Sequence, residues 1–323
     1  MTMAHAIRIH ETGGPEALQY ETIELAPPAP GEMRVRNTAI GLNFIDTYRR
    51  SGLYPVELPA VLGTEAAGVV EAVGEGVDAF APGDRIAWLG SGAYATHTNI
   101  PADTAVHLPD DVDDQTAASV FLKGLTCWML LFKVHRASPG ETALIWAAAG
   151  GVGSLLVPWA TSLGMEVIGV VSTEEKARKA RAHGAAHVLL SGSDVPAGVR
   201  DITGGRGVDV SYDSVGKESA AASLASLRRR GLFVTYGNAS GPVDPLPPAR
   251  LAMGGSLVMT RPTLFDFFRS PEERAEGAAA LFGALRTGTI SADVGQIYSL
   301  EDVAEAHRAL EARKTVGATV LIP

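Results

Sequence analysis

The chain has 323 residues, of which 46% are hydrophobic and 20% are charged, and its formal net charge is -9. This length predicts two domains, and the composition supplies a large core and argues against disorder. The negative charge repels phosphate backbones and anionic lipid surfaces, so binding to nucleic acid is not expected. The sequence shows no signal-peptide pattern and no apolar run near the ~20 residues of a membrane helix, so we expect a cytoplasmic protein with no membrane partner.

A single cysteine, Cys127, lies in the apolar stretch Leu125–Leu131. One cysteine excludes an internal disulfide and every structural zinc site that is built on several thiolates. The apolar surroundings favour a buried packing residue over a reactive thiol.

The first 120 residues contain short β-type runs that Gly and Pro separate, as at Ala26–Gly31 and Ala81–Gly83. The runs are Met33–Arg36, Gly68–Val73 and Asp84–Trp88. This pattern predicts an irregular, mostly antiparallel β domain.

A regular alternation of strands and helices begins near Gly140. The predicted strands are Ala143–Trp146, Val167–Val171, His187–Leu190, Val208–Tyr212, Leu232–Tyr236 and Ser256–Met259. Most of the intervening segments are helix-like, which indicates a doubly wound parallel sheet with helices on both faces. Six strands are the number in a complete dinucleotide-binding fold.

The alternation stops after Arg261-Pro262. Two amphipathic helices, Pro271–Arg286 and Ser299–Ala312, and a final strand, Ala318–Ile322, are predicted instead. Because these residues do not continue the repeat, we expect them to return to the first domain.

The strongest local motif is the glycine-rich segment Ala147–Gly153, which follows one predicted strand and leads into a predicted helix, Val152–Leu163. Glycines allow a tight turn and let a pyrophosphate approach backbone N–H groups at the helix N-terminus, where the helix dipole favours an anion. A glycine-rich turn with no ligand is the alternative, because the spacing departs from G-x-G-x-x-G. The six regularly spaced strands favour nucleotide binding.

The end of the next strand indicates which nucleotide is bound. An enzyme that uses NAD usually has Asp or Glu there, whereas this strand runs into Ser172-Thr173, with Lys176 one helical turn later. Two hydroxyl groups and a cation suit the 2′-phosphate of NADPH. Glu174 and Glu175 are expected to face solvent, and Ser172 with Glu175 also fits a helix capping box.

With these motifs in view, the chain resembles the zinc-independent quinone oxidoreductases, the zeta-crystallin-like group of the medium-chain dehydrogenase/reductase superfamily, over essentially its whole length. The segments that carry the resemblance are Gly41–Tyr48, Arg50–Tyr54, Gly63–Gly68, Phe121–Thr126, Ala147–Gly153, Tyr212–Gly216 and Thr260–Pro262. The resemblance implies an α/β chain with a GroES-like catalytic domain of residues 1–122 and 262–323. A Rossmann NADPH-binding domain of residues 123–261 is inserted, and the substrate cleft is expected between the two domains.

Zinc-dependent relatives have a cysteine ligand in the segment that matches Asn43–Asp46 and a histidine where Thr64 stands. They also have a lobe with four cysteines, which a chain with one cysteine lacks. The resemblance therefore implies an enzyme without a metal site.

The resemblance also implies roles for individual residues. Gly150, Gly151, Val152 and Gly153 would hold the pyrophosphate, and Ser172, Thr173 and Lys176 the 2′-phosphate. Ser191 would lie near that phosphate, where close relatives often have tyrosine. Asn43, Asp46, Tyr48, Thr64 and Thr126 would line the nicotinamide site, with Asn43, Tyr48 and Thr64 as the catalytic candidates. Tyr236, Gly237, Asn238 and Arg313 would contact the cofactor. Each role has a structural alternative: Tyr48 could pack between domains, Asp46 could fix a loop, and Thr64 could bind backbone groups.

Without a metal, the simplest chemistry is direct hydride transfer from NADPH to a small quinone. Reduction of α,β-unsaturated ketones or aldehydes and non-catalytic NADPH binding are the alternatives. Superfamily relatives commonly dimerise through the last strand of the nucleotide sheet. Here Ser256–Thr260 would be an apolar edge strand, so we expect a homodimer that pairs this edge.

Overall fold

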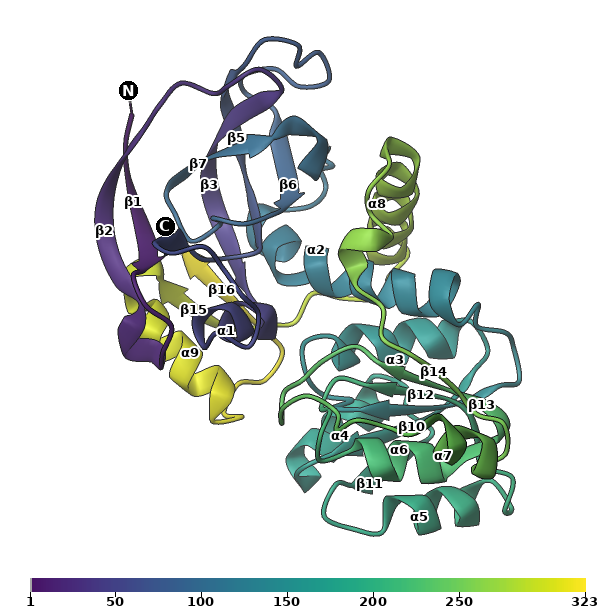
Figure 1. Ribbon diagram of the computed structural model, residues 1–323. Helices are drawn as coiled ribbons and strands as arrows, with labels where there is room; N and C mark the ends of the chain where they lie inside the picture. Colours follow the sequence, from purple (N-terminus) through teal and green to yellow (C-terminus); the bar gives the residue numbers. More distant parts are fainter. Residues whose placement is uncertain (1) are drawn as a thin grey trace. The chain divides into compact units, whose positions relative to one another are not determined.

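The computed structural model describes residues 2–323, which fall into two compact units. The β-rich unit contains the chain up to Leu122 together with Ala292–Pro323, and the parallel-sheet unit contains Lys123–Ser291. In Figure 1 the first unit is purple, blue and yellow, and the second is teal to green. Both ends of the chain therefore belong to one unit, as expected from the sequence.

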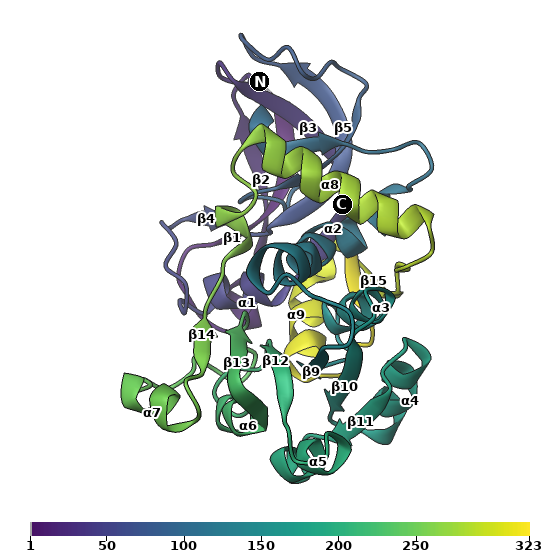
Figure 2. The same cartoon turned by 90° about the vertical axis from the view of Figure 1, so that its right-hand side faces the viewer.

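The parallel-sheet unit is built on a sheet with the strand order β11-β10-β9-β12-β13-β14, in which every pairing is parallel. Its strands are β9 (Thr142–Trp146), β10 (Glu166–Val171), β11 (His187–Leu190), β12 (Val208–Asp213), β13 (Leu227–Thr235) and β14 (Val258–Thr260). Figure 2 shows them side by side in this order. The six strands predicted from the sequence and the doubly wound topology are confirmed.

Helices connect these strands and explain the burial of the sheet. They are α3 (Gly153–Ser162), α4 (Glu174–Ala182), α5 (Val195–Ile202), α6 (Ala220–Ser226) and α7 (Pro248–Met253). All five residues of β9 and all six of β12 are buried, because a central parallel strand has helices on both faces. One cluster of the core joins Leu144 and Ile168 on the sheet to Val199 on α5.

The β-rich unit contains a sheet of order β15-β16-β3-β5-β6-β8, with β7 paired to β3, and a smaller sheet of order β2-β1-β4. The first set consists of β3 (Glu32–Leu42), β5 (Glu65–Val73), β6 (Arg85–Leu89), β7 (His97–Pro101), β8 (Ala105–His107), β15 (Val294–Ser299) and β16 (Ala318–Ile322). The second consists of β1 (Thr2–Ile9), β2 (Gln19–Leu25) and β4 (Ala60–Val61). Trp88, Tyr94 and Met33 are fully buried in its core.

The end of the chain completes this unit. Strand β16 pairs antiparallel with β3 and parallel with β15, so residues about 280 positions apart are neighbours in one sheet. The helix α9 (Val303–Glu311) follows the short 3-10 turn Leu300–Asp302, whose N-cap is Ser299, as predicted. The yellow helix α9 lies beside α1 (Phe44–Arg50) in Figures 1 and 2, and Arg50 binds Glu311 at its end.

The second domain boundary differs from the expected position at 262, because the chain returns to the β-rich unit only at Ala292. The helix α8 (Pro271–Arg286) belongs to the parallel-sheet unit, where its Gly277 packs against Leu125 and Trp128. The amphipathic pattern predicted this helix correctly, but the pattern does not specify the surface on which the apolar face packs.

One helix of the described chain is long and apolar enough to span a membrane. It is α2 (Asp114–Trp128) with its π-helical continuation Met129–Val134, a stretch of 21 residues that contains 18 consecutive residues with a mean hydropathy of 1.5. Most of these 18 residues, 78%, are buried inside the protein, which is the behaviour of a core helix.

Candidate functional site

The glycine-rich loop lies at the carboxyl end of β9 and leads directly into α3. Ala147 has a positive φ of 52°, and the Gly150 N–H donates to the Ala147 carbonyl at 2.8 Å, which closes the turn. A Cβ at Gly153 would lie 2.3 Å from the same carbonyl oxygen, so only glycine fits there. Val152, the N-cap, has no polar side chain that could cap the first N–H groups of α3. An anion can therefore bind at this helix N-terminus.

Cys127 lies directly beneath this loop. Its buried thiol donates to the Val152 carbonyl at 3.6 Å, and burial raises the pKa of the thiol far above its ordinary value. The expectation of a buried packing residue is confirmed. The contact also ties α2 to the glycine loop.

Ser172, Thr173 and Lys176 lie at the carboxyl end of the neighbouring strand β10. The N-cap of α4 is Thr173, whose hydroxyl accepts from the Lys176 N–H at 3.3 Å. The predicted capping box of Ser172 with Glu175 is therefore wrong by one residue, because Thr173 takes the extended N-cap conformation. Ser172 remains exposed.

Ser191 follows β11 at the same edge of the sheet, and its N–H donates to the Val171 carbonyl at 2.8 Å. This bond places Ser191 beside the end of β10. Glu174 and Glu175 are exposed in the first turn of α4, as expected.

The loops after β12 and β13 are joined at this edge. The fully buried carboxylate of Asp213 accepts hydrogen bonds from two backbone N–H groups and two hydroxyls, those of Val215, Gly216, Ser219 and Ser223. The Tyr236 N–H donates to the Asp213 carbonyl at 2.8 Å, and a Cβ at Gly237 would lie 2.4 Å from the Ser214 carbonyl oxygen. The predicted segment Tyr236–Asn238 thus lies on the same side of the sheet as the glycine loop.

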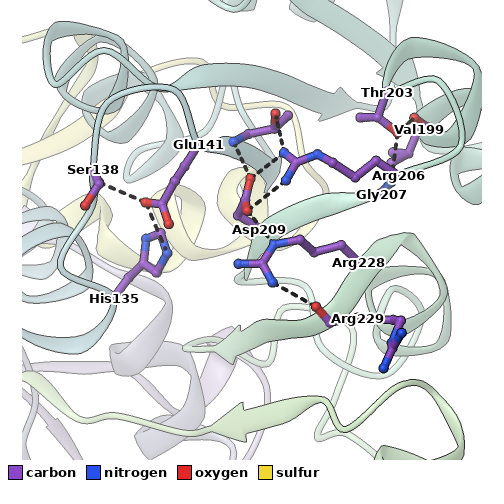
Figure 3. A network of polar contacts seen from close by, with 11 residues as sticks. His135, Ser138, Glu141, Val199, Thr203, Arg206, Gly207, Asp209, Arg228 and Arg229 are labelled. Atoms are coloured by element: carbon purple, nitrogen blue, oxygen red, sulfur yellow. Dashed lines mark hydrogen bonds and ion pairs between the residues drawn. The ribbon is translucent and has the colours of Figure 1, made fainter.

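The opposite edge of the sheet carries a charged network that sequence reasoning did not find (Figure 3). Asp209, near the start of β12, binds the guanidinium groups of Arg206 and Arg228 at 2.6 and 2.5 Å. Burial raises the pKa of Asp209, but these bonds and one from the Thr142 N–H outweigh burial and lower it to about 2. His135 contacts Glu141 at 3.6 Å and the Tyr212 hydroxyl at 2.9 Å, and burial lowers its pKa. Asp209 and Thr142 lie at the amino ends of β12 and β9, whereas Tyr212 lies near the carboxyl end of β12.

In the β-rich unit, Asn43 is the N-cap of α1 and Asp46 lies in its first turn. The Asn43 N–H donates to Asp46 Oδ2 at 2.9 Å, and Asn43 Nδ2 donates to Glu65 Oε1 at 2.7 Å. Asn43 and Asp46 are therefore both fixed by buried carboxylate contacts.

Asp46 and Thr64 belong to one buried hydrogen-bond network. Asp46 accepts from the Thr64 hydroxyl at 2.5 Å and from the Tyr94 hydroxyl at 3.0 Å, while Thr64 Oγ1 accepts from Arg49 at 3.0 Å. Burial raises the pKa of Asp46, and the hydrogen bonds and Arg49 oppose that rise. Thr64 has no exposed surface, so the structure gives it a supporting position, and its catalytic role remains a prediction.

The remaining predicted residues lie in separate places. Tyr48 is 8% exposed and packs edge-on against Tyr54, with ring centroids 5.3 Å apart. Thr126 is buried on α2, and Arg313 is exposed after α9 with a positive φ of 57°. Thr126 belongs to the parallel-sheet unit, and Tyr48 and Arg313 belong to the β-rich unit.

Glu65, Tyr94 and His307 were missed by sequence reasoning. Glu65 lies inside the motif Gly63–Gly68, which was one of the segments that carry the resemblance, but the motif did not indicate a role for this side chain. Tyr94 and His307 are 213 residues apart and meet only through the fold. No local pattern could have joined them.

The structure describes residues 2–323. No three His, Cys, Asp or Glu side chains of this described part lie close enough together to hold a metal ion.

Two family models match the chain. The alcohol dehydrogenase GroES-like domain matches residues 29–110, and the zinc-binding dehydrogenase model matches residues 151–284. The first lies in the β-rich unit and the second in the parallel-sheet unit.

Full-length relatives are also similar. The chain is 47% identical to a quinone oxidoreductase of Pseudomonas aeruginosa, over 99% of this chain and 100% of the relative. It is 44% identical to a 2-haloacrylate reductase of a Burkholderia species, over 99% of each. The solved structure of Escherichia coli quinone oxidoreductase complexed with NADPH superposes with a TM-score of 0.97 at 45% identity, over 99% of this chain and 100% of that one.

Proposed function

The chain belongs to the quinone oxidoreductase family of the medium-chain dehydrogenase/reductase superfamily, and we propose that it uses NADPH to reduce a small quinone without zinc. The observation that carries this proposal is the set of residues at the carboxyl ends of the parallel strands. There the glycine loop, Lys176 and Tyr236–Asn238 lie at the ends of strands in one sheet. This edge is where ligands bind in doubly wound folds.

The residues at this edge fit NADPH. The close approach of Gly153 to the Ala147 carbonyl leaves no room for a side chain, and the N-terminus of α3 faces the loop. We propose that Gly150–Gly153 hold the pyrophosphate there. Ser172, Thr173, Lys176 and Ser191 would bind the 2′-phosphate, because two strand ends bring hydroxyls and one cation together without a carboxylate at the strand tip.

When bound, NADPH would supply a hydride from C4 of its nicotinamide. The protein's own task is then to orient the reactants and exclude water. We propose that Asn43 and Tyr48 make these contacts, with Thr126, Asn238 and Arg313 as further cofactor contacts. Asp46 and Thr64 would act by supporting them. A quinone needs little acid catalysis, because its reduced form is a stabilised anion.

Independence from zinc is part of the proposal, although one matching family model carries zinc in its name. The chain has one cysteine, and Cys127 is buried and hydrogen-bonded to Val152. Thr64 is engaged by Asp46 and Arg49, so the residues present do not fit a zinc site.

A second candidate is reduction of a carbon–carbon double bond that is conjugated to a carbonyl. The 44% identity to a 2-haloacrylate reductase favours it, since a haloacrylate contains such a bond. This reaction would require stabilisation of an enolate, for which Tyr48 is the candidate donor.

Steady-state oxidation of NADPH and of NADH against a panel of quinones and enones tests these proposals. We expect turnover with quinones and a preference for NADPH. Turnover only with enones would favour the second candidate. Tight NADPH binding without turnover of either class would indicate a non-catalytic NADPH-binding protein and contradict both.

We also propose a homodimer that pairs β14 with its two-fold copy. Strand β14 ends the sheet, and Val258 and Met253 beside it are 53% and 87% exposed. Pairing would satisfy the open edge and cover these apolar side chains. The acidic composition and the single reduced cysteine are consistent with a cytoplasmic location, which we propose as well.

A further inference from the structure

A continuous chain of buried side chains links α9 to α1 within the β-rich unit. Arg50 Nη1 lies 3.0 Å from His307 Nδ1, His307 Nε2 lies 3.1 Å from the Tyr94 hydroxyl, and that hydroxyl lies 3.0 Å from Asp46 Oδ2. Tyr94, His307 and Asp46 have no exposed surface, and Arg50 is 2% exposed. Each member therefore depends on the next for its hydrogen bonds.

The donors fix the direction of every bond in this chain. Arg50 can only donate, so His307 Nδ1 must be the acceptor, and the single ring proton is then on Nε2. His307 Nε2–H therefore donates to the Tyr94 oxygen, and the Tyr94 hydroxyl donates its own hydrogen to Asp46. The remaining donors of Arg50 bind Glu311 and the Gly13 carbonyl.

This hydrogen-bond chain of Arg50, His307, Tyr94 and Asp46 is unsuited to moving protons. Burial, and secondarily the charge of Arg50, lowers the pKa of His307 to about 3, so its ring stays neutral near pH 7. Burial and the charge of Asp46 raise the pKa of Tyr94 well above its ordinary value. Arg50 does not release a proton. These groups can therefore hold one another in fixed positions, but they do not relay protons near pH 7.

We propose that Tyr94 and His307 are positioning residues that hold the Asp46 carboxylate, and through it the N-terminus of α1, in the geometry that the reaction requires. Asp46 Oδ2 accepts hydrogen bonds from both the Tyr94 hydroxyl and the Asn43 N–H. Asn43 and Tyr48, the residues proposed to contact nicotinamide or substrate, belong to this N-terminus and to the helix that it starts. The inference deepens the proposed function and rests on it, because a change in kcat can be measured only if the protein reduces a quinone.

Tyr94→Phe tests the inference, because it removes one hydroxyl and keeps the ring. Hydrogen exchange of peptides that cover residues 43–50 should become about tenfold faster, the scale of one lost hydrogen bond to a charged group. The kcat for NADPH-dependent quinone reduction should fall by about tenfold while KM for NADPH changes by less than about twofold, since NADPH is bound mainly elsewhere.

His307 variants provide a rescue. His307→Leu removes both the acceptor and the donor and should reproduce the effect of Tyr94→Phe. His307→Gln keeps one of each, so exchange and kcat should return toward those of the unmodified protein. Equal effects of the leucine and glutamine variants would overturn the role of His307.

Tyr212→Phe is the matched control, because Tyr212 is also fully buried with its hydroxyl 2.9 Å from a histidine nitrogen, but lies in the parallel-sheet unit. It should leave the exchange of residues 43–50 unchanged. Unchanged exchange in Tyr94→Phe, or faster exchange with an unchanged kcat, would overturn the inference. The exchange measurement needs no turnover, so a protein that reduced no quinone would contradict the proposed function and leave this measurement decisive for the hydrogen-bond chain.

Discussion

Glu65 fixes the orientation of Asn43. Its Oε1 accepts from Asn43 Nδ2 at 2.7 Å, and its Oε2 accepts from the Leu122 N–H at 2.6 Å. Because a carboxylate only accepts, the amide nitrogen of Asn43 must face Glu65. A Cβ at Gly41 would lie 2.2 Å from Oε1, so glycine leaves the space that the carboxylate occupies.

Glu65→Gln should disturb this arrangement, because a glutamine has one acceptor oxygen for two donors. We expect a loss of about 1–3 kcal/mol in the free energy of unfolding and a lower kcat. Chemical denaturation and steady-state kinetics measure the two effects. Glu71→Gln on the same strand β5, where the side chain is 36% exposed beside Arg36, is the control and should change little. Normal kcat in Glu65→Gln would contradict the importance of Asn43 orientation.

Lys176→Ala should raise KM for NADPH by roughly ten- to a hundredfold and leave KM for NADH nearly unchanged, because a charge-assisted contact to the 2′-phosphate is lost. Initial-rate kinetics with both coenzymes measure this. Arg178→Ala, an exposed cation on the same helix, is the control. Equal losses with both coenzymes would refute a role for Lys176 in 2′-phosphate binding.

Asp209→Asn should lower the free energy of unfolding by an amount that depends on pH. The pKa of Asp209 is about 2 in the folded chain against an ordinary value of 3.8, so its stabilisation is complete above pH 4 and is lost as the pH falls toward 2. We expect a deficit of about 1–2 kcal/mol at pH 7, reduced by screening at the exposed guanidinium groups, which shrinks below pH 4. Urea denaturation at several pH values measures it, with the exposed Asp201→Asn as control. A deficit that is independent of pH would contradict this.

Val258→Pro should convert the proposed dimer to monomers, because it places proline in an edge strand that is proposed to pair with its copy. Val258→Lys should do the same by placing two charges face to face while keeping the N–H. Light scattering measures the mass. Ile297→Lys is the control, since Ile297 is 54% exposed on β15, an edge strand of the larger sheet in the β-rich unit. A monomeric unmodified protein at micromolar concentration would end the dimer proposal.

Dialysis against a strong chelator should leave quinone reduction intact, because the chain has no thiolate set to hold zinc. Activity before and after dialysis, with a zinc-dependent alcohol dehydrogenase as control, measures this. Loss that added zinc restores would contradict the zinc-independent proposal.

Much of the parallel-sheet unit could be predicted from the sequence. Strand β11 and helix α8 have the predicted bounds, and the other strands differ by a few residues at their ends. Burial on both faces produces apolar runs between helices, and that pattern is local. The return of the chain at Ala292 could not be predicted, because the packing of Gly277 on Trp128 depends on a surface formed far away in the sequence.

The sequence predicted which residues belong to the candidate site, but it did not predict which side chains contact one another. The glycine loop and Lys176 follow from local motifs, and the structure brings them to one sheet edge. Asp46 and Thr64 were identified through the resemblance, but their bonds to each other and to Tyr94 required the fold. Burial removes such side chains from water and commits them to one another, which a linear pattern does not show.

The thiol of Cys127 has a consequence for the chemistry of a quinone reductase. Quinones and conjugated enones are electrophiles that add to thiolates, and a thiolate forms only where the thiol is accessible and its pKa is near ambient pH. The one cysteine of this chain is buried, its pKa is raised, and its hydrogen is given to Val152. The protein therefore presents no cysteine thiolate to the proposed substrates, and Cys127 is protected from arylation by the compounds that the protein would reduce.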